Sequence, residues 1–304
     1  MSSFEVITLG CGSAKPSLNH NPSSTVVRHR GSLYMIDCGE GAQKAFMAQR
    51  LPFSRLRHIF LTHLHGDHVF GLPGLVGTLA LSDIGGDLTI HTFQEGADIL
   101  DNIFRYFCAD TPFKLNFNVI TPEEKIILET KSLSVRTIPL HHRIPAVGFV
   151  FEEKPKERHI NPDMTRFYQV PFSWMNRLKA GEDFITPDGS TVPNHILTTA
   201  PSPSLSYAHI SDTAYMPHLA EKIGPVDLLF HETTYLDDLE IKAKQRGHST
   251  ASQAARVARD AGAKRLLTGH YSSRYNNDAP FLEEASKIFP DVILNREGLV
   301  IPLD

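Results

Sequence analysis

Short apolar or alternating runs, separated by Gly, Pro and Asn turns, dominate the chain and predict β-strands. In the first half the predicted strands cover 5–9, 24–27, 33–36, 58–62, 88–92, 125–128, 132–139 and 146–152, with helices at 41–49 and 69–81. In the second half strands are predicted at 206–210, 227–231 and 265–268, and a helix at 250–261. Two strand-rich halves with interspersed helices favour two packed sheets with helices on their outer faces.

One long segment, 153–203, departs from this pattern. It is rich in Pro and polar residues and contains the single tryptophan, Trp174. Strand patterning resumes after it, so we interpret the segment as an excursion from the core, an arm or a flap, and not as a linker. The expected organisation is a single domain over residues 1–304 that carries this excursion.

Composition narrows the class of protein only a little. A chain of 304 residues can bury a large core, and its net charge of -4 offers no bulk electrostatic attraction for nucleic acid. Any binding of a polyanion must therefore come from a local patch. Cys11, Cys38 and Cys108 lack short pair spacing, so neither a disulfide framework nor a thiolate zinc knuckle is indicated. With no readable secretory signal or membrane-spanning run, we expect a cytoplasmic location and no membrane partner.

Histidine clustering is the strongest chemical signal. Three of the sixteen histidines fall in the run THLHGDH at 62–68, directly after an apolar strand. His63 and His65 share a face because alternate residues of a strand do, and a turn at Gly66 returns Asp67 and His68 to the same point. An isolated His-x-His is more often a solvated loop. Three imidazoles and a carboxylate behind a strand instead match the ligands that zinc prefers.

This HxHxDH run resembles that of the metallo-beta-lactamase superfamily, whose α/β (α+β) fold is a four-layer αββα sandwich. Within the superfamily the chain is similar to the ribonuclease Z family of tRNA 3′-end endonucleases. The matching segments are IDCGEGAQ (36–43), LTHLHGDHVFGLPGLVGTL (61–79), SDT (211–213), HETTYLDD (231–238), GHSTASQAA (247–255) and TGHYSSRY (268–275). The HST element at 248–250 is the discriminating piece, since many hydrolases of the superfamily lack it.

The resemblance implies a dinuclear metal site whose later ligands follow strand-like runs. The implied ligands are His63, His65 and His142 for one ion, Asp67, His68 and His270 for the other, and Asp212 as the bridge. His141 and His142 cannot both point inward from an extended backbone, and His142 matches the family pattern better. The expected cofactors are two zinc ions per chain, with manganese or iron as alternatives.

The implied activity is that of a zinc-dependent phosphodiesterase, in which water activated by two metal ions removes 3′ extensions from precursor tRNA. Asp67 would also accept a proton, and His248 would contact the scissile phosphate and protonate the leaving oxygen. Glu232 would orient His248. The structural alternatives are that His248 caps the following helix and that Glu232 is a surface carboxylate.

Substrate-binding elements resemble the family less closely. Arg274 would meet substrate phosphate, with a surface ion pair as the alternative, and Arg177 and Lys179 retain the basic end of the family's tRNA-gripping arm. The Gly-Pro element of that arm is replaced by the run at 170–174, Val170 to Trp174. Leu18 and His20 stand where the family loop PxKxRN has basic residues.

Precursor tRNA remains the expected substrate, with a homodimer in which one subunit's arm assists the other's site. One alternative is a related phosphodiesterase or other hydrolase with a non-tRNA substrate. A catalytically silent binding protein is a second alternative. It would be expected to have lost ligands, and none of the seven proposed positions is lost.

Overall fold

The computed structural model describes residues 4–82, 84–108 and 111–304, and it divides into two compact units. The larger unit takes in the described residues of Met1–Leu128, Val135–Phe151 and Leu205–Asp304, and the smaller unit takes in Glu129–Ser134 and Glu152–Ser204. Residues 1–3, 83 and 109–110 of the expected domain lie outside the described residues. Within the described part of the chain, no helix is long and apolar enough to cross a membrane.

The first sheet of the larger unit has seven strands and carries the HxHxDH loop. Its order is β18 (Val300–Pro302), β1 (Phe4–Gly10), β2 (Ser24–His29), β3 (Ser32–Ile36), β4 (Leu56–Phe60), β5 (Gly86–Thr92) and β6 (Phe113–Val119). Pairing is antiparallel from β18 to β3 and parallel from β3 to β6. The parallel strands therefore deliver their carboxyl ends to one edge of the sheet.

The second sheet also has seven strands. Its order is β17 (Val292–Ile293), β16 (Leu266–Gly269), β15 (Leu228–Glu232), β14 (Ser206–Ile210), β9 (Ala146–Glu153), β8 (Leu133–Leu140) and β7 (Ile126–Glu129). Strands β14 to β17 are parallel to one another. The segments that follow β8, β14, β15 and β16 hold the later candidate ligands and their supporting residues.

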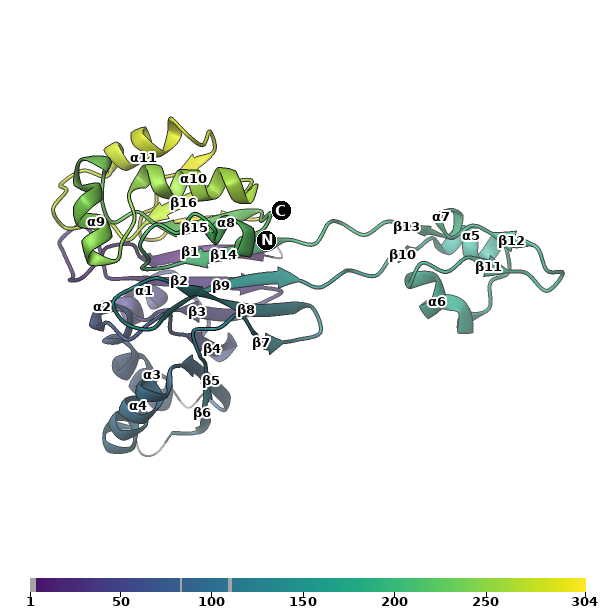
Figure 1. Ribbon diagram of the computed structural model, residues 1–304. Coiled ribbons are helices and arrows are strands. Elements are labelled where there is room, and N and C mark those ends of the chain that lie inside the picture. Colours follow the sequence, from purple (N-terminus) through teal and green to yellow (C-terminus); the bar gives the residue numbers. More distant parts are fainter. Residues whose placement is uncertain (1–3, 83, 109–110) are drawn as a thin grey trace. The chain divides into compact units, whose positions relative to one another are not determined.

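Helices cover the outer face of each sheet, as Figure 1 shows for the larger unit. On the first sheet these are α1 (Ala42–Ala48), α2 (Gly66–Val69), α3 (Leu72–Leu81) and α4 (Gln94–Phe107). On the second they are α8 (Leu219–Ile223), α10 (Ala251–Ala261) and α11 (Ala279–Ser286), while α9 (Glu240–Arg246) lies in the segment before α10. The predicted αββα sandwich is thus confirmed.

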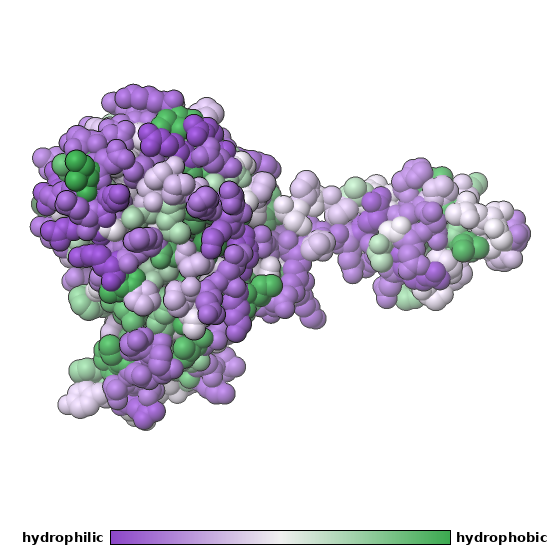
Figure 2. Space-filling view, viewed as in Figure 1, coloured by the Kyte–Doolittle hydropathy of each residue, from purple (hydrophilic) through white to green (hydrophobic). Residues whose placement is uncertain are grey.

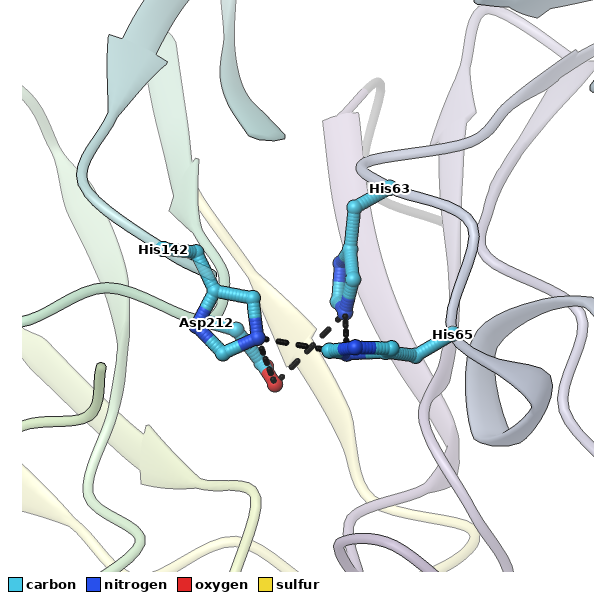
Figure 3. Close-up of side chains that lie close together, drawn as sticks. All are labelled: His63, His65, His142 and Asp212. Atoms are coloured by element: carbon cyan, nitrogen blue, oxygen red, sulfur yellow. Dashed lines mark hydrogen bonds and ion pairs between the residues drawn. The ribbon is translucent and has the colours of Figure 1, made fainter. Parts of the chain in front are cut away.

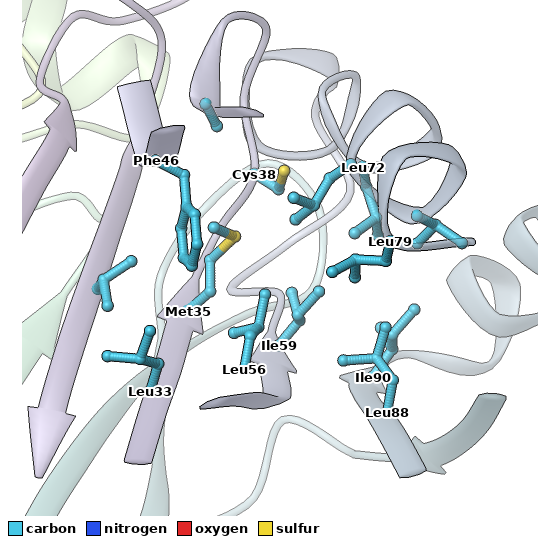
Figure 4. Packing of buried hydrophobic residues seen from close by; sticks show 14 of the residues in the cluster. Leu33, Met35, Cys38, Phe46, Leu56, Ile59, Leu72, Leu79, Leu88 and Ile90 are labelled. Atoms are coloured by element: carbon cyan, nitrogen blue, oxygen red, sulfur yellow. The ribbon is translucent and has the colours of Figure 1, made fainter. Parts of the chain in front are cut away.

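One hydrophobic core lies between the first sheet and its helices (Figure 4). Leu33 and Met35 of β3 are two residues apart, as are Leu88 and Ile90 of β5, so each pair projects to the same face. They pack in the same cluster as residues of α1 and α3, among them Phe46. Burying one such side chain fully contributes about 1.5–3 kcal/mol, so this cluster holds the sheet that positions the HxHxDH loop.

Helix α10 is fixed at both ends by local sequence. Thr250 accepts a hydrogen bond from the Gln253 backbone, and the Gln253 side chain reaches back to the Thr250 backbone, which completes a capping box. Gly262 ends the helix in the left-handed conformation with φ 71°. The predicted helix at 250–261 is confirmed to within a residue, and its cap holds the segment that carries His248.

Several details of the first half differ from the sequence predictions. The helix predicted at 69–81 begins only at Leu72, as α3, while Val69 ends the short helix α2. The two helices are separated near Gly71, where a Cβ would lie 2.0 Å from the Gly39 carbonyl oxygen. The strand predicted at 58–62 ends at Phe60, because its parallel partner β3 ends opposite at Ile36. Helix α4 and strand β6 were not predicted at all.

The smaller unit is folded around its own core. It contains β10 (His159–Ile160), α5 (Pro162–Phe167), η2 (Phe172–Trp174), α6 (Met175–Lys179), β11 (Phe184–Ile185), β12 (Thr191–Val192), α7 (Asn194–Leu197) and β13 (Thr198–Thr199). Leu178, Phe184, Val192 and Leu197 form its hydrophobic cluster. The face of each unit seen in Figure 2 is mostly hydrophilic, with apolar side chains in small groups.

Candidate metal centre

The HxHxDH loop leaves the buried end of β4 and enters α2 at once. His65 is the N-terminal cap residue of α2 with an extended backbone, and Gly66 is the first helical residue. A Cβ on Gly66 would lie 2.2 Å from the Phe70 ring, so any larger residue here would require that exposed ring to move. Asp67 and His68 consequently lie in the first turn of α2, beside His63 and His65 in the loop.

The first group of donors joins the loop to β8 and β14 (Figure 3). His65 Nδ1 lies 3.0 Å from His63 Nε2 and 3.2 Å from His142 Nε2. Asp212 Oδ2 lies 3.6 Å from His63 Nε2 and 3.9 Å from His142 Nε2. These donors all lie within 4.8 Å of one another. His141, the neighbour of His142, is exposed.

The second group lies on the other side of Asp212. Asp67 Oδ2 is 3.5 Å from His68 Nε2 and 3.6 Å from His270 Nε2. Asp212 Oδ1 is 3.6 Å from His68 Nε2 and 3.2 Å from His270 Nε2. Asp212 therefore turns one oxygen to each group. The structure brings all seven expected ligands together around this one carboxylate.

The donor atoms fit divalent cations. The Nε2 atoms of His68 and His270 are buried and find no hydrogen-bond partner among the described residues, an arrangement that costs about 1–3 kcal/mol for an unsatisfied polar atom. Their Nδ1 atoms are satisfied, by Asp37 at 2.7 Å and by Thr234 at 2.8 Å. His142 Nδ1 likewise lies 2.7 Å from the Gly247 carbonyl oxygen. Each ring is thereby oriented with its other nitrogen toward the cluster.

Asp37 is a supporting residue that sequence analysis did not single out. It accepts hydrogen bonds from the Thr62 backbone and hydroxyl, both at 2.8 Å, in addition to the one from His68. Asp37 and His270 have φ of 55° and 64°, a left-handed conformation that non-glycine residues rarely adopt and that costs on the order of 1–3 kcal/mol. An acidic residue directly after the apolar run 33–36 was the available signal.

Burial and charge set the protonation of the cluster. Burial lowers the pKa of His63 well below its usual value, and it also lowers the pKa of His65 and His142, so these rings are neutral, as ligands must be. Burial opposes charge on His68 too, yet the carboxylates of Asp37 and Asp212 raise its pKa to about 10. This site attracts positive charge, which a divalent cation would supply in place of the proton.

Glu232 and His248 form a buried pair beside the cluster. His248 Nδ1 lies 3.0 Å from Glu232 Oε1, and Glu232 also accepts hydrogen bonds from Thr213, Thr234 and Ser249. Although burial opposes charge on His248, the Glu232 carboxylate raises its pKa to about 9. Glu232 has no exposed surface, and Thr250, not His248, caps α10, so both structural alternatives disagree with the geometry.

A cavity of about 380 Å³ opens over the metal-ligand side chains. The cationic side chains that line it differ from the phosphate-binding residues predicted from the sequence. Lys15 and Arg143 line it together with His248 and the exposed Phe70, whereas Arg274 is exposed after β16 and is not one of the lining residues. Sequence analysis did not single out Arg143, although its position directly after the candidate ligand His142 was an available signal.

Arg177 and Lys179 lie on α6 of the smaller unit. Arg177 Nη2 is 2.7 Å from Glu182 Oε2, and its guanidinium carbon lies 3.8 Å from the centre of the Trp174 ring. Lys179 Nζ is 3.4 Å from Glu157 Oε2. Both cations are thus ion-paired within their own unit.

Comparison with known proteins agrees with the fold and the donor set. Residues 19–154 match the model of the Metallo-beta-lactamase superfamily, and residues 196–271 match that of a Beta-lactamase superfamily domain. The fold and the donor set make this chain a member of the metallo-beta-lactamase superfamily, which implies that it binds divalent metal.

Ribonuclease Z of Parabacteroides distasonis is 48% identical over 300 residues, covering 98% of this chain and 99% of the relative. Ribonuclease Z of Bacteroides thetaiotaomicron is 46% identical over 305 residues, covering 100% and 96%. The crystal structure of human tRNase Z, short form, superposes with a TM-score of 0.71 at 25% identity and covers 99% of each chain. The chain belongs to the ribonuclease Z family.

Proposed function

We propose that this chain is a zinc-dependent endonuclease that removes 3′ extensions from precursor tRNA. The observation that carries the proposal is the position of Asp212, which offers one oxygen to each of two donor groups directly beside the His248–Glu232 pair. Family membership supplies the substrate class, because the relatives are ribonuclease Z and tRNase Z enzymes.

Seven residues would hold two zinc ions, with manganese or iron as alternative metals. His63, His65 and His142 would hold one ion, Asp67, His68 and His270 the other, and Asp212 both. A pair of bound divalent ions lowers the pKa of water toward neutrality and stabilises the charge that develops on a phosphodiester during in-line displacement. The proton transfers of the reaction would be carried out by side chains of the protein.

His248 is the proposed general acid. It lines the cavity while its Nδ1 stays bonded to Glu232, so the opposite ring nitrogen is the one available to substrate. The raised pKa of His248, about 9, keeps the ring protonated at neutral pH, and it can donate that proton to the leaving oxygen. Asp67 is the proposed proton acceptor in addition to its role as a ligand.

Lys15 and Arg143 are the cations placed to meet substrate phosphates, because both line the cavity that contains Asp67, Asp212 and His248. We keep Arg274, Arg177 and Lys179 as proposed contacts to the body of the tRNA outside this cavity. Arg177 and Lys179 belong to the smaller unit, which we propose is the family's arm in altered form, acting on the site of a second subunit in a homodimer.

A parallel cleavage assay tests this function. Metal-loaded protein would be incubated with 5′-labelled precursor tRNA bearing a 3′ extension and, separately, with a chromogenic phosphodiester. We expect a single RNA product that ends at the discriminator nucleotide. Cleavage of the chromogenic diester with intact RNA would instead favour the related phosphodiesterase, and metal binding without either activity would favour a silent binding protein.

A further inference from the structure

A second cluster of metal-ligand side chains lies outside the catalytic cavity. Cys11 follows β1, His20 lies in the loop 12–21, and Glu297 precedes β18. One donor atom from each of the three lies within 4.8 Å of the other two. The proposed mechanism uses none of them.

Distances around His20 divide its two ring nitrogens into two kinds. Nε2 lies 2.9 Å from Asp278 Oδ2, the length of an ordinary charge-assisted hydrogen bond. Nδ1 instead faces Cys11 Sγ at 3.3 Å and Glu297 Oε2 at 3.2 Å, and Cys11 Sγ is 3.5 Å from Glu297 Oε1. Nδ1 also lies 3.3 Å from Glu297 Oε1, so it faces the sulfur and both carboxylate oxygens at 3.2–3.3 Å, distances longer than the roughly 2.7–2.9 Å of a charge-assisted hydrogen bond.

The proposed catalytic ligands show the same division. His142 Nδ1 makes a 2.7 Å hydrogen bond to the Gly247 carbonyl oxygen, while its Nε2 stands 3.2 Å from His65 Nδ1. Tetrahedral zinc with bonds of about 2.0–2.3 Å separates its donors by about 3.3–3.7 Å. A carboxylate behind a ligating imidazole, as Asp278 is behind His20, is the usual way such a ring is oriented.

We propose that Cys11, His20 and Glu297 form a further metal site that binds a divalent cation of zinc's class, with Asp278 orienting His20. Thiolate, imidazole and carboxylate are all zinc ligands, and three of them leave a fourth position for water. His20 also lines a separate pocket of about 250 Å³, which gives solvent and ions access to the site. Cys108 differs from Cys11 in this respect, because it belongs to none of the donor clusters found among the described residues.

Metal binding at this site must displace protons. Burial raises the pKa of the Cys11 thiol to about 12, and the hydrogen bond to Asp278 raises the pKa of His20 to about 12. Both groups are therefore protonated in the metal-free protein at neutral pH. Forming the metal–sulfur and metal–nitrogen bonds would release the thiol proton and the Nδ1 proton to solvent.

The loop 12–21 connects this site to the proposed catalytic centre. The Asn21 backbone N–H donates to Glu297 Oε1 at 2.9 Å, and the Ala14 backbone N–H donates to Asp67 Oδ2 at 2.7 Å. Ala14 has φ 65°, an unfavourable conformation for alanine that needs the loop to be held at its ends. A cation at Cys11, His20 and Glu297 would hold the loop in the conformation that contacts Asp67.

Cobalt substitution tests the site directly, because the seven catalytic donors are nitrogen and oxygen only. A thiolate-to-cobalt charge-transfer band in the near ultraviolet therefore reports this site and not the catalytic one. Protein stripped with chelator and reloaded with Co²⁺ would be measured by absorbance and elemental analysis. We expect the band and a third bound cobalt in the wild type, and loss of both in Cys11→Ser. Cys108→Ser is the matched control and should keep both.

Asp278→Asn provides a second variant that leaves the buried cysteine in place. It should weaken cobalt binding at this site about 10–100-fold and retain the band at saturation. Two cobalt ions and no band in the wild type would overturn the proposal and leave His20 as a metal-free ion-pair residue. A band that survives Cys11→Ser would also overturn it. Neither result depends on tRNA cleavage, so the proposed function stands or falls separately.

Discussion

Replacing Glu232 by Gln should make the rate of precursor tRNA cleavage fall as the pH rises from 6 to 8, a range in which the wild-type rate should change little. The carboxylate contacts His248 Nδ1 at 3.0 Å and is held in place by the Thr213, Thr234 and Ser249 backbones and the Thr234 hydroxyl. An amide nearly keeps the shape but removes the charge. The general-acid role of His248 depends on that charge, because burial alone disfavours the imidazolium.

The size of the effect follows from the pKa of His248, which is raised from 6.5 to about 9 against the opposing effect of burial. Without Glu232 only the more distant Asp212 carboxylate opposes the effect of burial, so the pKa of His248 should fall toward 6.5, a difference of roughly 3 kcal/mol. At pH 8 the protonated fraction would then drop from about nine in ten to about one in thirty, so kcat should fall about 30-fold. At pH 6 both proteins are largely protonated and should differ only a few-fold.

The assay is single-turnover cleavage of precursor tRNA between pH 6 and pH 9, with metal content checked at each pH. It measures the ratio of the wild-type rate to the Glu232→Gln rate at each pH. Glu40→Gln is the matched control, since Glu40 is an exposed carboxylate of the same cavity that makes no hydrogen bond to His248. A ratio of wild-type to Glu232→Gln rates that stays constant with pH would show that Glu232 does not set the protonation of His248. So would a loss of metal, because Glu232 would then support the donors and not the acid.

Four further outcomes are expected. Asp37→Asn should lower metal affinity about 10–100-fold in equilibrium dialysis, because it disturbs the acceptor behind His68; unchanged affinity would contradict that support. His248→Ala should abolish turnover and keep the metal, as elemental analysis would show. Arg143→Ala should raise KM for precursor tRNA more than Arg274→Ala does, and the reverse order would mean that the cavity is not where phosphate binds. Chelation of the metals should lower Tm in calorimetry, because the cations bind the folded cluster only.

Sequence reasoning was most successful where chemistry and chain pattern coincide. The HxHxDH run predicted its own geometry, since a strand end and a glycine turn suffice to gather its side chains. His142, Asp212 and His270 were reached only through family resemblance. Their convergence depends on how two sheets meet, and nothing local in the sequence encodes that.

The residues missed at the two candidate sites share a physical cause, because each acts through contacts that form only when the chain folds. Asp37 and the Ala14 N–H act through tertiary hydrogen bonds to residues far along the chain, at 2.7 Å to His68 and 2.7 Å to Asp67. Cys11 has no nearby cysteine or histidine motif, so its spacing indicated no metal site, whereas folding places it 3.3 Å from His20 Nδ1. Helix α4 was missed although one face is buried through Leu100 and Phe104.

Anomalous diffraction at the zinc edge, from a crystal of the zinc-loaded protein, would locate the bound ions directly. We expect two peaks in the catalytic cluster, one on each side of the Asp212 carboxylate, with His63, His65 and His142 around one and Asp67, His68 and His270 around the other. A single peak there, or an Asp212 side chain turned away from both groups, would contradict this expectation.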